Sequence, residues 1–125
     1  MNIRDANRIV VINKHCDEII EVLNKHKYSK DEFYKDIEYK NSLLFSLLQI
    51  GECANSLTSD FIMNHKDFSV HKMVATRNVI VHGYEKIRMD EIWQTCINDI
   101  PKLKKTVIKL ANEYSIELDY GYPIL

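Results

Sequence analysis

Glycine and proline are scarce in this 125-residue chain, which has three glycines and two prolines. An all-β sandwich or barrel of this length needs turn residues every ten residues or so, and their scarcity argues against that class of fold. Apolar residues make up 46% and charged residues 28% of the chain, which are ordinary values for a globular protein and argue against disorder. The length allows one core of ordinary size, so we expect a single domain over residues 1–125.

Long apolar runs and paired cysteines are missing as well. The longest uncharged stretch, Asn41–Gly51, is well short of the roughly 20 apolar residues that a membrane-spanning helix requires, and charges precede any apolar run at the N-terminus. The three cysteines are odd in number and form no C-x-x-C pair, which argues against a disulfide framework and a zinc ribbon. We therefore expect an unprocessed cytoplasmic protein without membrane contact, in which Cys16, Cys53 and Cys96 are free, buried thiols.

The chain also lacks the excess of basic charge that is typical of nucleic-acid-binding proteins. Lysine and arginine total 17 and aspartate and glutamate total 18, so the formal net charge is −1 and the pI is near 6.5. The field of the whole molecule will not attract a polyanion. A polyanionic ligand must therefore be bound by a local patch.

Apolar residues recur at helical spacing along most of the chain. One stripe predicts a helix from about Asp5 to Lys25. Ser29 and Glu32 form a capping-box pattern, which predicts a second helix that continues through a densely apolar centre and ends near residues 56–59.

Polar residues interrupt the helical pattern twice in the second half of the chain. After a polar connection at Met63–Asp67, Ser69 is placed to cap a third long helix that ends near Gly83. Asp90 stands where the N-cap of a last helix would be, and Pro101 is expected to kink or restart that helix. The pattern predicts an all-α, up-and-down bundle of four to five helices, followed by an irregular tail at residues 115–125.

Motifs for metals and nucleotides are absent. His15 and Glu18 give only the reverse of the Glu-x-x-His pairs that di-metal bundles use, and a solvated helix face explains them better. The sequence contains no G-x-G-x-x-G, G-K-[ST] or H-E-x-x-H pattern. We therefore expect neither a metal nor a cofactor.

Ionisable residues enclose an apolar run in the segment R-N-V-I-V-H-G-Y, from Arg77 to Tyr84, on a helix that we expect to be among the most buried. Asn78 and His82 are four residues apart and share a helix face. If the helix continues through Gly83, Arg77 and Tyr84 lie on one side of it. Arg77 and His82 are about 140° apart around the axis, so within one chain they do not naturally touch.

Two interpretations of this segment are open at this point. In the structural one, Arg77 pairs with a core carboxylate such as Asp36 or Glu52, and His82 is stabilised by the dipole at the C-terminal end of the helix. In the functional one, these side chains form a site.

The segment resembles the R-x-x-x-x-H-x-Y signature of the HepT-like toxins of the HEPN superfamily. The stretch L-Q-I-G-E-C-A-N at residues 48–55 is similar to the family's I-G-E-A-A stretch, and residues 92–103 resemble its W…D-[IL]-P-x-L segment. One departure is Phe68-Ser69-Val70-His71, where family members often have a tryptophan. We expect His71 to lie at the surface. The resemblance implies a helical bundle with endoribonuclease activity.

The side chains of the motif fit metal-independent RNA cleavage by attack of the ribose 2′-OH on the neighbouring phosphate. That reaction needs a base, an acid and a cation near phosphorus. Histidine as a residue type can act as either base or acid near neutral pH, which suits His82 to either role, and Arg77 can bind phosphate oxygens in bidentate fashion. Asn78 would orient the imidazole or the phosphate. Arg77, Asn78 and His82 are therefore the predicted catalytic residues.

The resemblance further implies a homodimer with its active site between the protomers, where two sets of Arg77 and His82 make a local positive pocket. We expect the nearby lysines to form a solvated helix face; they are Lys102, Lys104, Lys105 and Lys109.

In pairs of this type the partner is a minimal nucleotidyltransferase antitoxin that uses ATP, and the resemblance implies that it silences the toxin by AMPylation of Tyr84, in a larger hetero-oligomer. Such a toxin belongs to a type II toxin-antitoxin pair, and its substrate is RNA. Two other classes stay open: a non-catalytic HEPN module that binds nucleotide or RNA, and an adaptor subunit of a nucleotidyltransferase.

Overall fold

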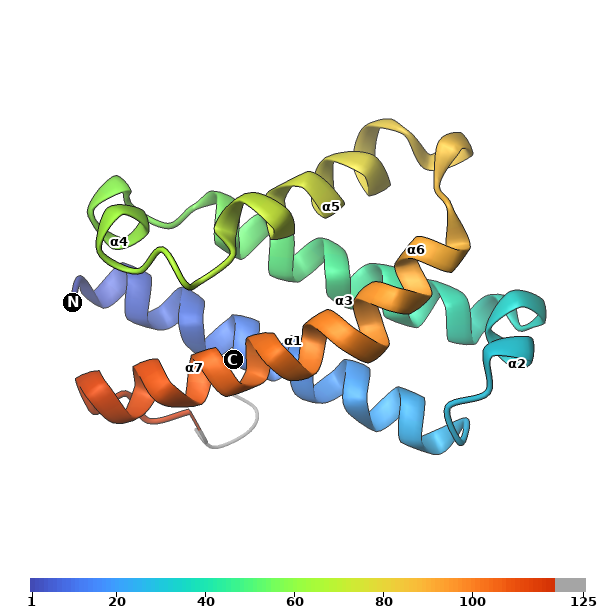
Figure 1. Cartoon of the computed structure of the whole chain (residues 1–125), viewed down its shortest axis with the longest axis horizontal. Helices are drawn as coiled ribbons and strands as arrows, with labels where there is room; N and C mark the ends of the chain where they lie inside the picture. Colours follow the sequence, from blue (N-terminus) through green and yellow to red (C-terminus); the bar gives the residue numbers. More distant parts are fainter. Residues whose placement is uncertain (119–125) are drawn as a thin grey trace.

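The computed structural model describes residues 1–118, and these residues form an all-α bundle, as the sequence pattern predicts (Figure 1). The elements in chain order are α1 (Ile3–Lys25), α2 (Lys30–Lys35), α3 (Ile37–Asn55), α4 (Ser59–Asn64), α5 (Val70–His82), the 3-10 turn η1 (Tyr84–Lys86), α6 (Met89–Gln94), the π-helical turn η2 (Thr95–Asp99) and α7 (Ile100–Tyr114).

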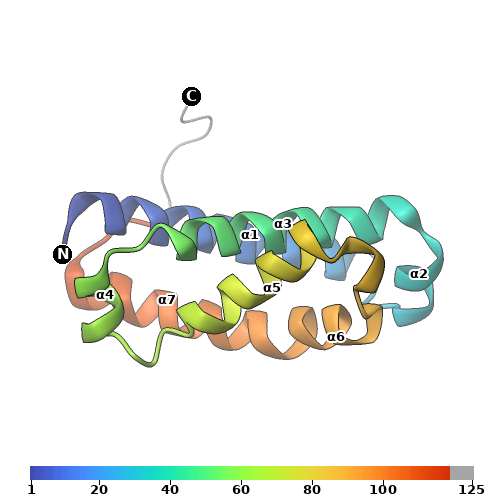
Figure 2. The same cartoon turned by 90° about the horizontal axis from the view of Figure 1, so that it is seen from above.

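Four long helical segments alternate in direction along the bundle (Figure 1). α1 and α5 run one way, while α3 and the continuous segment formed by α6, η2 and α7 run the other. In the view from above, α1 and α3 lie on one side, α6 and α7 lie on the other, and α5 runs obliquely between them (Figure 2). The prediction of an up-and-down bundle is therefore confirmed.

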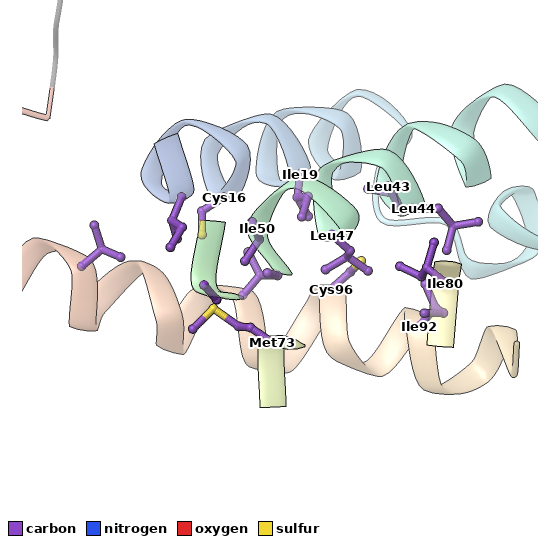
Figure 3. Packing of buried hydrophobic residues seen from close by; sticks show 14 of the residues in the cluster. Cys16, Ile19, Leu43, Leu44, Leu47, Ile50, Met73, Ile80, Ile92 and Cys96 are labelled. Atoms are coloured by element: carbon purple, nitrogen blue, oxygen red, sulfur yellow. The ribbon is translucent and has the colours of Figure 1, made fainter. Parts of the chain in front are cut away.

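The core lies between these segments and receives side chains from all of them (Figure 3). Buried residues include Cys16 and Ile19 from α1, Leu47 and Ile50 from α3, and Cys96 from η2. Burial of such side chains contributes about 1.5–3 kcal/mol each relative to exposure, which is the main force that holds the helices together.

The second predicted helix is in fact two helices, because Asp36 breaks it. Asp36 has extended backbone angles, φ −92° and ψ 108°, and its Oδ1 accepts hydrogen bonds from the backbone N–H groups of Glu38 and Tyr39. This N-cap starts α3 at Ile37. Ser29 caps α2 as predicted, with a hydrogen bond of 3.1 Å from the Glu32 N–H to its Oγ.

The connection between α3 and α5 contains a short helix, α4, that the sequence pattern did not predict. Thr58 caps it by accepting the Phe61 N–H. The Thr58 hydroxyl in turn donates to the buried carboxylate of Asp5 at 2.6 Å, which joins α4 to the start of α1. Ser69 precedes α5, but its side chain makes no capping hydrogen bond.

The last long segment begins at Met89 with Arg88 as its N-cap residue, so the predicted N-cap at Asp90 is wrong by two positions. Pro101 restarts the helix, because it stands in the first turn of α7 directly after the π-helical turn η2. The Ile100 N–H donates to the Thr95 carbonyl, five residues back, which is π-helical spacing. Proline has no N–H, so it interrupts the regular α-helical ladder at this point.

The cysteines are free thiols, as predicted. Cys16 and Cys96 are buried, and burial raises the pKa of each to about 12, whereas Cys53 is only half-buried. Residues 115–118 continue from α7 without regular structure, and Ile116 and Leu118 pack against the core. The rest of the predicted tail, residues 119–125, lies outside the described residues. Among the helices of residues 1–118, none combines the length and apolar composition needed to cross a membrane.

Candidate functional site

The helix that carries the predicted site residues, α5, packs closely against α3 at Gly51. A Cβ atom at position 51 would collide with the Cβ of Arg77 and lie 2.8 Å from the Met73 carbonyl oxygen. Only glycine fits this crossing without a shift of one helix. The close approach brings the base of the Arg77 side chain directly onto α3.

Two neighbouring side chains hold the Arg77 guanidinium. Its Nε donates to the Glu52 carboxylate on α3, and its Nη1 donates to Asn78 Oδ1 at 2.9 Å. The Arg77 side chain is 23% exposed. Of the two carboxylates that the sequence leaves open as partners, Glu52 therefore forms the ion pair, and Asp36 instead caps α3.

This arrangement leaves one edge of the guanidinium available. Among the described residues, Nη2 has no hydrogen-bond partner, and Nη1 uses one of its two N–H groups. Two adjacent nitrogens with remaining N–H groups are what bidentate binding of a phosphate requires. Asn78, which was expected to orient either an imidazole or a phosphate, contacts Arg77 in the structure.

His82 is the last residue of α5 and is exposed. Its side chain makes no hydrogen bond or ion pair with the described residues. Asn78 and His82 are both exposed on this regular helix, so they share a face as predicted. The structure brings Arg77 and Asn78 into contact but places His82 about one and a half turns further along.

Tyr84 does not lie on α5, because the helix ends at His82 and Gly83 is its C-cap residue. The Gly83 N–H donates to the Val79 carbonyl at 2.9 Å, and Tyr84 then starts the 3-10 turn η1. The premise that the helix continues through Gly83 is therefore wrong. Tyr84 is 57% exposed, so more than half of the residue is open to solvent.

The expectation that α5 is among the most buried helices is also wrong. Its buried residues are Val70, Met73 and Ile80, whereas Val79 and Val81 are 45% and 43% exposed. α5 packs mainly against α3, so its opposite face is open. His71 lies on this helix and is exposed, as predicted.

A cavity of about 370 Å³ lies on another flank of α5, between α3, α5 and the start of α7. Its lining includes Leu47, Ile50 and the ion pair between Lys72 and Asp99, which is 2.9 Å long. The motif residues do not line it; Thr76, next to Arg77, does. The cavity is therefore separate from the exposed face that carries Asn78 and His82.

The lysines on α7 form a solvated face only in part. Lys102 and Lys105 are exposed, but Lys104 is 24% exposed and pairs with Asp17 on α1 at 2.8 Å. Lys109 lies 3.7 Å from Asp67.

His15 is buried rather than solvated as expected. Its Nδ1 lies 2.8 Å from Glu18 Oε1, and its ring packs edge-on against exposed Phe45. Burial lowers the pKa of His15, although Glu18 opposes the shift. Within residues 1–118, no three His, Cys, Asp or Glu side chains are grouped so that they could hold a metal ion.

Two residues of this site were not among the predicted site residues. From the sequence, Glu52 was considered only as one of two possible ion-pair partners of Arg77. Gly51 was considered only as part of the stretch that resembles I-G-E-A-A. The sequence signal that could have identified them is that a glycine is followed directly by an acid in I-G-E. A glycine lets a second helix approach closely, and the carboxylate next to it can then bind an arginine on that helix.

The fold and the motif define an all-α protein of the HEPN type. A family model described as "Ribonuclease HepT-like" matches residues 12–110. The chain therefore belongs to the HepT-like ribonuclease family, as the motif resemblance predicts.

Curated relatives agree with this family. The chain is 28% identical over 102 residues, 82% of its length and 83% of the relative's, to a protein of Methanocaldococcus jannaschii named "Putative RNase". It is 27% identical over 82% of its length and 89% of the relative's to a protein of the same name from Caldanaerobacter subterraneus subsp. tengcongensis. A second such protein of Methanocaldococcus jannaschii is 31% identical over 61% of the chain and 78% of that relative. No solved structure matches the chain significantly.

Proposed function

We propose that this protein is a metal-independent endoribonuclease and the toxin of a type II toxin-antitoxin pair. One observation carries the proposal: Nε and Nη1 of the Arg77 guanidinium are hydrogen-bonded, whereas Nη2 has no partner within residues 1–118 and is free to bind a phosphate. Arg77 lies on the same helix as His82, which is the last residue of that helix. An anchored cation and a solvent-accessible imidazole are the groups that cleavage of RNA by its own 2′-OH requires. Membership of the HepT-like family and the RNase names of the relatives support RNA cleavage as the activity.

In the proposed mechanism, a neutral His82 removes the proton from the 2′-OH, whose oxygen then attacks the adjacent phosphorus. Arg77 stabilises the negative charge that grows on the phosphate oxygens. A second, protonated histidine donates a proton to the departing 5′ oxygen, so the products are a 2′,3′-cyclic phosphate and a 5′-hydroxyl. Asn78 holds Arg77 Nη1 and thereby contributes to the phosphate site.

The second histidine comes from a second copy of the chain. Within one chain, the described residues include no other histidine in the motif, and a single imidazole cannot be base and acid in the same step. In a symmetric dimer, the α5 helices of the two chains would face each other. Together they would supply two His82 and two Arg77 side chains to one cleft. Such a dimer also concentrates positive charge in that cleft although each chain is nearly neutral.

His82→Ala tests the proposed reaction. We expect RNA cleavage to fall by at least about 100-fold, because general acid–base catalysis contributes that much or more. The matched control is His71→Ala, which removes another exposed histidine from α5 and should leave cleavage unchanged. Circular dichroism checks that both variants fold, and cleavage by the wild type should persist in EDTA. Full activity of His82→Ala contradicts the mechanism, and loss of wild-type activity in EDTA with rescue by Mg²⁺ contradicts metal independence.

A second candidate is a non-catalytic HEPN module that binds nucleotide or RNA, or an adaptor subunit of a nucleotidyltransferase. The open Nη2 edge of Arg77 favours it as well, because a phosphate can be bound there without reaction. Such a protein would be harmless when expressed alone, and His82→Ala would leave its binding to RNA or to the partner unchanged. Growth arrest by the wild-type chain, abolished in His82→Ala, separates the toxin from both alternatives.

A further inference from the structure

Glu52 and Arg77 join α3 and α5 at the edge of the candidate site. Glu52 follows Gly51, the residue at which the two helices cross, and its carboxylate accepts the Arg77 Nε–H. The Glu52 side chain is 46% exposed and has no other partner among the described residues. A partly exposed ion pair of this kind adds little to the free energy of unfolding. We therefore consider a functional role for it beside the site.

We propose that Glu52 is a positioning residue that fixes the plane of the Arg77 guanidinium for phosphate binding. This inference rests on the proposed ribonuclease function. Glu52 holds Nε from α3, and Asn78 holds Nη1 from α5, so two different nitrogens are anchored from two different helices. A planar group anchored at two points has its third nitrogen, Nη2, fixed in direction.

The geometry favours positioning over two other roles. A carboxylate that competed with RNA for the end of the guanidinium would bind between Nη1 and Nη2, but Glu52 binds Nε. A carboxylate that served as the general base would need to reach the 2′-OH while free of other contacts, but Glu52 is engaged with the guanidinium. Anchoring also has an electrostatic cost, because the carboxylate cancels part of the arginine charge that attracts RNA.

If Glu52 positions Arg77, the variants Glu52→Ala and Glu52→Gln should differ in their cleavage kinetics. The alanine variant loses the acceptor for Nε, and we expect kcat to fall by roughly 10- to 100-fold with little change in KM. The glutamine variant keeps an acceptor oxygen and loses the charge, so it should retain most of kcat and bind RNA at least as tightly as the wild type. The matched control is Glu38→Gln, which makes the same charge change at an exposed position on α3 far from Arg77.

A structural readout accompanies the kinetics. In ¹⁵N-resolved NMR spectra, the Nε–H signal of Arg77 should be visible in the wild type and in Glu52→Gln, and it should be lost through fast exchange with water in Glu52→Ala. Thermal unfolding midpoints of all variants should agree closely, because the pair is partly exposed.

Several results overturn the proposal. Unchanged or faster cleavage by Glu52→Ala shows that the carboxylate does not position Arg77 or that it competes with RNA. If Glu52→Gln is as inactive as Glu52→Ala and loses the acidic limb of the pH–rate profile, Glu52 is the general base. A wild-type chain that does not cleave RNA, or a His82→Ala variant that cleaves normally, instead overturns the proposed function itself, and the inference falls with it.

Discussion

The side chain of Arg77 illustrates what a motif can and cannot predict. The spacing from Arg77 to His82 identifies a candidate site, and the structure confirms that both residues lie on one helix with Arg77 bound to a carboxylate. The sequence could not choose between Asp36 and Glu52, because the choice depends on which turn of α3 crosses α5. Gly51 decides it, since it brings the following residue, Glu52, within reach of Arg77.

Tyr84 is the residue at which we expect regulation. Its exposed phenol stands two residues after His82, where a hydroxyl oxygen can attack the α-phosphorus of ATP in a partner enzyme and release pyrophosphate. Co-expression with a cognate nucleotidyltransferase should add AMP to Tyr84 and suppress RNA cleavage, because the new phosphodiester places a bulky negative charge two residues from His82 and would repel the RNA phosphates. Mass spectrometry of the Tyr84 peptide, together with a cleavage assay, measures both effects.

Tyr114→Phe is the control for that experiment. Tyr114 lies at the end of α7 and its hydroxyl is 2.8 Å from His65 Nε2, away from the motif. This variant should be silenced as fully as the wild type, whereas Tyr84→Phe should escape. An adduct on Tyr114, or silencing of Tyr84→Phe, would show that the antitoxin acts elsewhere.

Helical periodicity predicted the long elements and missed the short ones. α1 and α5 begin and end within two residues of the predicted limits, because their apolar stripes are long and their ends carry clear signals such as Gly83. The helix break at Asp36 and the short helix α4 were not predicted, because each depends on a side-chain cap within an otherwise helical or polar stretch. The exposure of α5 depends on how it packs against the other helices, which periodicity does not report.

Gly51→Ala tests the crossing of α3 and α5. The added methyl group collides with the Arg77 side chain and the Met73 carbonyl, so one helix must move. We expect the free energy of unfolding to fall by about 1–3 kcal/mol, the usual cost of overpacking. Urea denaturation monitored by circular dichroism measures it.

Gly83→Ala provides the comparison for that measurement. A Cβ at position 83 would lie 3.3 Å from the Val79 carbonyl oxygen, and Gly83 has an ordinary φ of −129°. The free energy of unfolding should therefore change less for Gly83→Ala than for Gly51→Ala. Equal effects of the two substitutions would show that the close approach at Gly51 is not what limits the packing of α3 against α5.

The molecule as a whole carries almost no net charge, yet the proposed substrate is a polyanion. The proposed dimer would resolve this conflict, because it would bring the cationic groups of two chains into one cleft while the rest of the surface stays balanced. The exposed apolar residues Val79 and Val81 lie on α5 between Arg77 and His82 and are available for contact with a second copy. The fold could be predicted from one chain, whereas a site shared between two chains stays a prediction that rests on the family resemblance and on the need for both a base and an acid.

Cleavage by mixed dimers tests the composite site most directly. Two differently tagged chains, one wild type and one His82→Ala, are co-expressed and the heterodimer is isolated through both tags. If one histidine is the base and its copy in the second chain is the acid, the heterodimer should retain less than about a tenth of the wild-type rate. A heterodimer of wild type with His71→Ala should keep the full rate. Half of the wild-type rate in the His82→Ala heterodimer would mean that each chain cleaves RNA independently and would contradict the composite site.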